Sequence, residues 1–117
     1  MVKNTWNDWH KKSQLAIVDG DLSLALDCEI AAINALNPAT QQRTLGITVV
    51  SACAIACRGK DFERLNKIAG QWFGEIPEYF QVQVASILTD ATGSVPEPIK
   101  MLATKRIQDL INGILDT

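Results

Sequence analysis

The sequence predicts an all-α protein, and three observations lead to this fold class. Apolar residues recur at steps of three and four along most of the chain, which is the period of a helix and not the alternation of a strand. Short segments with Gly, Asp, Asn or Pro separate these stretches, as at helix ends. One apolar pattern also recurs after 40 residues. Together they predict a single domain over residues 1–117, with about six helices in stacked antiparallel hairpins or a compact α-α bundle.

The first hairpin is expected at about residues 5–38. Asn4 or Thr5 can cap its first helix, because a short polar side chain accepts a hydrogen bond from a free N–H group of the first turn. The turn "DGD" ends this helix at Gly20 and offers Asp21 as the next cap, and Pro38 closes the second helix. The second helix is expected to turn one face inward, made of Leu22, Ala25, Cys28, Ala32, Ile33 and Leu36.

The second hairpin is expected at about residues 40–77. Its first helix, from about residue 39 to 58, contains "LGITVVSACAIAC", which is apolar on most sides and indicates a helix covered by several neighbours. The β-branched residues of this run also allow a strand, but its length favours a helix. Gly59 ends it, Asp61 caps the following helix, and Pro77 ends the unit.

A third hairpin is expected at about residues 78–115. The segment "EYFQVQVASILTDA" is its first helix, and "TGSVPEP" is a linker. A last helix follows with one apolar stripe, made of Ile99, Leu102, Ile107, Leu110, Ile111 and Ile114.

An offset of 40 residues aligns the second helix with the fourth. The cap Asp21 falls on Asp61, and a glycine before each cap recurs at Gly20 and Gly59. The aligned inward positions are Leu22 with Phe62, Ala25 with Leu65, Cys28 with Ile68, Ala32 with Trp72, Ile33 with Phe73, and Leu36 with Ile76. Such periodicity is typical of helical hairpins that bury their apolar faces by stacking on one another.

The stretch "GDLSLALDCEIAAINALNP" resembles the second half of a tetratricopeptide repeat, with its Gly-Asp turn, large apolar residue, small residue three positions later and closing proline. The stretch "GKDFERLNKIAGQWFGEIP" is similar, through Asp61, Phe62, Leu65, Ala69, Trp72 and Pro77. The resemblance covers roughly residues 5–77 and implies a right-handed array that binds protein segments. The spacing of 39–40 residues exceeds the family's period of about 34, and Glu29 stands where an aromatic residue is common. A generic helical solenoid or bundle therefore stays open.

Composition narrows the function classes. The net charge of −2 argues against a dedicated nucleic-acid binder, which usually has a basic excess. The polar start "MVKNTWNDWHKK" does not fit a signal peptide, and no apolar run is long enough to span a membrane. Three cysteines, an odd number in apolar stretches, do not fit a disulfide framework. We therefore expect a cytoplasmic protein in a reducing compartment.

No residue pattern indicates an enzyme, a metal site or a cofactor. Cys53 and Cys57 share one helix face, but Zn²⁺ needs about four ligands and only Cys28 and the single histidine, His10, could add to them. Buried structural thiols are the simpler interpretation. A catalytic Cys–His pair that uses His10 is the alternative.

Two groups of residues are candidates for binding a partner. Trp6, Trp9 and His10 lie on one edge of the first helix, where aromatic residues serve either as interface hot spots or as core anchors. A thin, mostly polar stripe on the third helix lines a groove or is the one side of a buried helix that meets solvent. Its residues are Thr44, Thr48, Ser51, Ile55 and Arg58.

The sequence therefore predicts a non-catalytic protein-interaction module, a small adaptor or chaperone that binds a peptide or helix of a partner. Small tetratricopeptide-like chaperones, including those of bacterial secretion systems, have a similar size and layout, and this parallel is one of architecture alone. One alternative is a homodimer that associates through the last helix or the aromatic edge of the first, with a structural or regulatory role. Another is a helix-turn-helix nucleic-acid binder that uses "RGKDFER" and "KMLATKR".

Overall fold

The computed structural model describes residues 5–92, and these residues are all-helical, as predicted. The predicted boundaries agree with the structure to within a few residues, and the strand interpretation of the central apolar run is wrong, since this run is helical. The predicted helix at 99–114, and with it the second half of the third hairpin, lies outside the described residues. The elements are α1 (Trp6–Val18), α2 (Leu22–Asn34), α3 (Gln42–Arg58), α4 (Phe62–Trp72), the short 3-10 helix η1 (Phe73–Glu75) and α5 (Glu78–Thr92).

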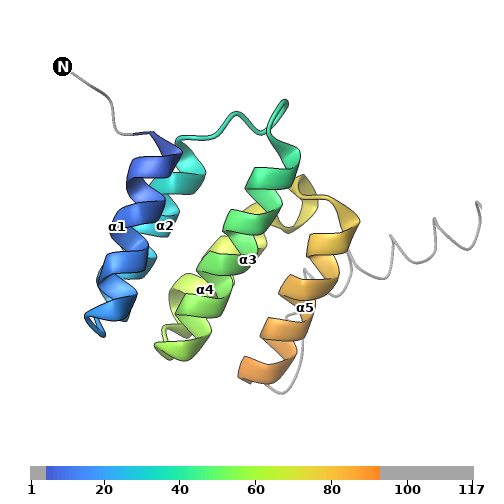
Figure 1. Ribbon diagram of the computed structural model, residues 1–117. Coiled ribbons are helices and arrows are strands. Elements are labelled where there is room, and N and C mark those ends of the chain that lie inside the picture. The colour runs from blue at the N-terminus through green and yellow to red at the C-terminus, as the bar shows by residue number, and fades with distance from the viewer. Residues whose placement is uncertain (1–4, 93–117) are drawn as a thin grey trace, which may run out of the picture.

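The helices form two layers (Figure 1). Helices α1, α3 and α5 lie side by side in a front layer, and α2 and α4 lie behind them. Helix α2 packs against both α1 and α3, while α3 also packs against α4 and α5. Helix α3 is thus the central helix that the sequence predicted from its apolar run.

Side-chain caps begin three of the helices where the sequence placed them. Thr5 caps α1 and exchanges hydrogen bonds with Asp8 in a capping box. The carboxylate of Asp21 accepts a hydrogen bond from the N–H group of Leu24 at 3.0 Å. Asp61 accepts the equivalent bond from Arg64 at 3.2 Å. Each cap satisfies an N–H group that has no partner within its helix, and so determines where the helix begins.

The turns before Asp21 and Asp61 have matching hydrogen bonds 40 residues apart. The N–H of Asp21 donates to the carbonyl oxygen of Ala16 at 2.9 Å, and the N–H of Asp61 donates to that of Ala56 at the same distance. In both turns the residue just before the cap adopts a positive φ, which is 80° at Gly20 and 56° at Lys60.

The predicted equivalence of Gly20 with Gly59 is therefore wrong by one residue. Position 60 occupies the left-handed conformation that favours glycine, and it is a lysine. Gly59 has a φ of −82°, which any residue adopts. The reason is that the conformation of each turn is set relative to its aspartate cap. Asp21 and Asp61 are 40 residues apart, so Gly20 is equivalent to Lys60.

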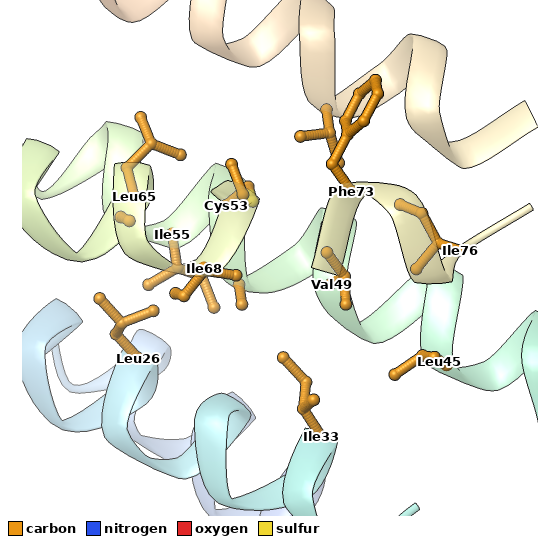
Figure 2. Packing of buried hydrophobic residues seen from close by; sticks show 14 of the residues in the cluster. Leu26, Ile33, Leu45, Val49, Cys53, Ile55, Leu65, Ile68, Phe73 and Ile76 are labelled. Carbon is orange, nitrogen blue, oxygen red and sulfur yellow. The ribbon is translucent and has the colours of Figure 1, made fainter. Parts of the chain in front are cut away.

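The hydrophobic core lies between the two layers (Figure 2). Most of the predicted inward positions are buried, which confirms the helical periodicity. Phe62 is an exception, because 39% of it is exposed at the start of α4. The labelled core residues of Figure 2 are Leu26, Ile33, Leu45, Val49, Cys53, Ile55, Leu65, Ile68, Phe73 and Ile76.

A glycine sets the close approach of α3 and α5. Gly46 is buried on α3, and a Cβ atom at this position would overlap the ring of Phe80 on α5. Behind this contact, the side-chain amide of Gln81 donates to the carbonyl oxygen of Phe73 at 2.8 Å and ties α5 to η1. The two contacts hold α5 in the front layer beside α3.

Candidate functional site

A polar cluster joins α1 to α2 and α3, and it contains three of the predicted partner-binding residues. The imidazole Nδ1 of His10 on α1 lies 2.9 Å from Oε1 of Glu29 on α2. The Glu29 side chain is fully buried, while 37% of the His10 side chain is exposed. The two groups share a hydrogen bond that links α1 to α2. The pair therefore compensates an acidic group that is costly to bury alone.

Trp6 extends this cluster to α3. Its ring stacks on that of His10, with the ring centres 4.9 Å apart and the planes 7° from parallel. Its indole N–H donates to the hydroxyl oxygen of Thr48 at 2.9 Å, and that hydroxyl donates to the carbonyl oxygen of Thr44 at 2.6 Å. The half-buried indole and imidazole are thus engaged by their own chain, and they act in this structure as packing and hydrogen-bonding groups between helices.

Two buried oxygen atoms beside this network have no hydrogen-bond partner among the described residues. They are the hydroxyl oxygen of Ser13 on α1 and Oε2 of Glu29. Each buried oxygen atom without a partner costs free energy of folding, because it has lost its hydrogen bonds to water.

Trp9 makes a contact of its own on α1. It is half-buried, and the ammonium group of Lys12 lies 4.7 Å from the centre of its ring. This cation–π contact shields the ring partly from solvent.

The exposed side of α3 differs by one position from the predicted stripe. Thr48 and Ile55, which the prediction placed on this side, are only 1% and 5% exposed and face neighbouring helices. Ser51 is half-buried and Arg58 is exposed, so these two predicted residues remain. The row that faces solvent, here named the α3 stripe, consists of Arg43, Ile47, Ser51, Ala54 and Arg58. These residues follow one another at steps of three and four, so they lie along one face of the helix.

A hollow opens where the α3 stripe meets α5. Ile47 is 46% exposed and Tyr79 is 72% exposed, and both border this hollow. The hollow is lined by Arg43, Ile47, Pro77, Tyr79, Phe80 and Gln83. Sequence reasoning missed both residues, because Ile47 lies in a run that was expected to be covered on several sides and Tyr79 was assigned to no group. A helical projection centred on Arg43 and Arg58 would have placed Ile47 on the exposed face.

Two of the three thiols, those of Cys28 and Cys53, are buried, and the third, that of Cys57, is half-buried. Cys53 is fully buried in the core, and burial raises its pKa to about 12. Burial also raises the pKa of the Cys28 thiol. A thiol with a raised pKa is rarely present as the nucleophilic thiolate. Across residues 5–92, no group of three His, Cys, Asp or Glu side chains is arranged to hold a metal ion.

Arg64 is the most connected charged residue of the back layer. Its guanidinium donates to the carboxylate of Asp61 at 2.6 Å, to the carboxylate of Asp27 on α2, and to the hydroxyl of Ser23 at 3.1 Å. These bonds join α4 to α2, so Arg64 is committed to the fold.

Comparisons with known proteins add no homologue from which a function could be transferred. The chain matches no protein-family model, no curated protein and no solved structure. Within the described part of the chain, no helix has both the length and the apolar character needed to cross a membrane. The functional argument therefore depends on the geometry of the front layer.

Proposed function

We propose that this chain is a non-catalytic protein-interaction module, an adaptor or chaperone of tetratricopeptide-like design that binds a segment of a partner protein on its front layer. The observation that carries the proposal is the hollow between α3 and α5, where Ile47 and Tyr79 remain exposed beside the guanidinium of Arg43. A partner side chain that enters the hollow would remove this apolar surface from water, at about 25 cal/mol per Å².

The layer arrangement supports the same proposal. Three helices lie side by side in front of two others (Figure 1), and the turns before α2 and α4 have the same hydrogen bonds. Stacked hairpins of this kind present one helix of each pair along a continuous surface that suits an elongated ligand. In this interpretation α3 is the central helix of the binding surface, because it has a neighbour on each side.

A peptide-library selection against the purified chain tests the proposal. The Ile47→Asp variant places a charge at the hollow, and we expect selected peptides to bind it at least tenfold more weakly. Leu24→Asp is the matched control, since Leu24 has a similar size, is 49% exposed and lies on α2 in the back layer. Equal binding of a selected peptide to both variants would contradict the proposal, provided that circular dichroism shows both to be folded.

A homodimer is the second candidate function. Leu15 and Val18 near the end of α1 are 66% and 83% exposed, and a two-fold contact could cover them. Light scattering at several protein concentrations tests this candidate, and Val18→Asp should abolish any dimer. The helix-turn-helix alternative has less support, because Arg64 of its basic segment is bound to two carboxylates.

A further inference from the structure

The α3 stripe has a cation at each end and small or apolar residues between them. Arg43 and Arg58 are both exposed, and they stand at the first and last turns of α3. Ile47, Ser51 and Ala54 lie between them on successive turns. The α3 stripe therefore has a positive charge at each end and apolar or small side chains between the two charges.

Neither arginine forms an ion pair with another residue of the described range 5–92. Among the lysine and arginine side chains of this range, Arg64 is the one that forms ion pairs. The guanidinium groups of Arg43 and Arg58 are therefore available to a ligand, in contrast to that of Arg64. Guanidinium groups bind carboxylates through paired, charge-assisted hydrogen bonds, which sets the chemistry of a complementary partner.

The spacing of the two arginines sets the length of that partner. Arg43 and Arg58 are fifteen residues apart on α3, and each residue of a helix adds about 1.5 Å along its axis. The backbones of the two arginines are therefore about 22 Å apart. An extended chain covers the same distance in about seven residues, at roughly 3.3 Å per residue. A helical ligand would need about fifteen residues for the same span.

The width of the α3 stripe favours the extended ligand. On one side of the stripe, Thr48 is covered by its bond to Trp6 of α1. On the other, Gly46 is covered by Phe80 of α5. Between these two contacts the open surface of α3 is narrow, with Arg43, Ile47 and Arg58 as its exposed residues. An extended chain, whose alternate side chains point one way, fits a narrow surface better than a helix of about 10 Å diameter.

We infer that the ligand of the front layer is an extended acidic segment of a partner protein, with two Asp or Glu side chains about seven residues apart and an aliphatic or aromatic residue between them. One carboxylate binds Arg43, the other binds Arg58, and the apolar residue enters the hollow beside Ile47 and Tyr79. This inference rests on the proposed function, because it specifies the ligand of the same surface.

Fluorescence anisotropy with a synthetic octapeptide tests the inference. The peptide is acetylated and amidated, with glutamates at both ends and leucine and valine at its centre, and the control peptide has the same composition with the two glutamates adjacent at one end. We expect the first peptide to bind several-fold more tightly than the second. Arg43→Gln and Arg58→Gln should each weaken binding of the first peptide about two- to fivefold, in the range of exposed ion pairs. The double variant should weaken it about tenfold and reduce its salt dependence.

Matched variants separate loss of charge from loss of structure. Lys67→Gln removes an exposed cation from α4 in the back layer and should leave binding unchanged. Replacing both arginines by lysine retains the charge but loses the paired hydrogen bonds, so it should weaken binding less than the double glutamine variant does.

Three results would overturn the inference. These are equal binding of the two peptides, wild-type affinity of the double glutamine variant, and tighter binding by a helical fifteen-residue peptide of the same charge spacing. Absence of any binding at millimolar peptide would also reject the acidic ligand. The library selection with Ile47→Asp would then still decide whether the front layer binds other peptides.

Discussion

The replacement of Lys60 by glycine is expected to stabilise the protein. Lys60 lies in the turn between α3 and α4 with a φ of 56°, a conformation that costs an L-residue roughly 1–2 kcal/mol. It is exposed, and its side chain makes no hydrogen bond or ion pair within residues 5–92, so its replacement removes no such bond there. Glycine removes the cost but adds about 0.4–1 kcal/mol of conformational entropy to the unfolded chain. The net gain in the free energy of unfolding is therefore about 0.5–1 kcal/mol.

Two glycine variants serve as controls for the register of the turns. Gly20→Ala should lower the free energy of unfolding by about 1 kcal/mol, because its φ of 80° is strained for alanine although the space around it is open. Gly59→Ala should be neutral or slightly stabilising, since its φ of −82° is ordinary and the added Cβ would lie 3.5 Å from the Cβ atom of Leu22.

Urea denaturation followed by circular dichroism at 222 nm measures all three variants. In a thermal scan followed by the same signal, a gain of about 0.5–1 kcal/mol should raise the melting temperature of Lys60→Gly by about 2–6 °C. The reasoning is refuted if Lys60→Gly is destabilised by more than 0.5 kcal/mol, or if Gly59→Ala loses more stability than Gly20→Ala. Either result would mean that the strained position of the second turn is not residue 60.

Three further predictions concern the interior. Gly46→Ala should destabilise the protein by about 1–3 kcal/mol in urea denaturation, since its Cβ would overlap Phe80, and Phe80→Ala in the same chain should recover part of the loss. His10→Ala should cost about 2–3 kcal/mol because it leaves the buried carboxylate of Glu29 unpaired, and a loss under 0.5 kcal/mol would show that the pair is unimportant. The thiol of Cys53 should stay unmodified by iodoacetamide at pH 8 until the protein is unfolded, as judged by mass spectrometry, and rapid labelling of the folded chain would contradict its burial.

The helices and their starts could be predicted because the signals are local. Caps such as Asp21 and Asp61 act on N–H groups within the same turn, and the apolar period of each helix depends only on its own residues. The alignment of Gly20 with Gly59 was wrong because it used residue type alone.

Glycine is frequent in turns, but the hydrogen bonds of the whole turn decide which position has a positive φ. In the second turn this position is Lys60, although a lysine disfavours that conformation.

The candidate site was less predictable, because it depends on how the helices pack. Trp6, His10 and Thr48 were selected as groups that face a partner, but the packing of α1 against α2 and α3 joins them to one another and to Glu29. His10 and Glu29 lie on different helices, so no periodic spacing in the sequence indicates that they meet.

The sequence by itself determined the fold class, the order of the helices in residues 5–92 and most of the residues that form the core. The reason is that the amphipathic period and the capping of a helix depend on neighbouring residues. Only the tertiary structure decided which side of α3 meets solvent, and this changed the candidate surface from Thr48 and Ile55 to Arg43, Ile47 and Arg58. The physical reason is that α3 is apolar on most sides. The period of α3 alone therefore does not fix, to within one position, which of its sides is exposed. The neighbouring helices α2, α4 and α5 decide this by covering the other sides.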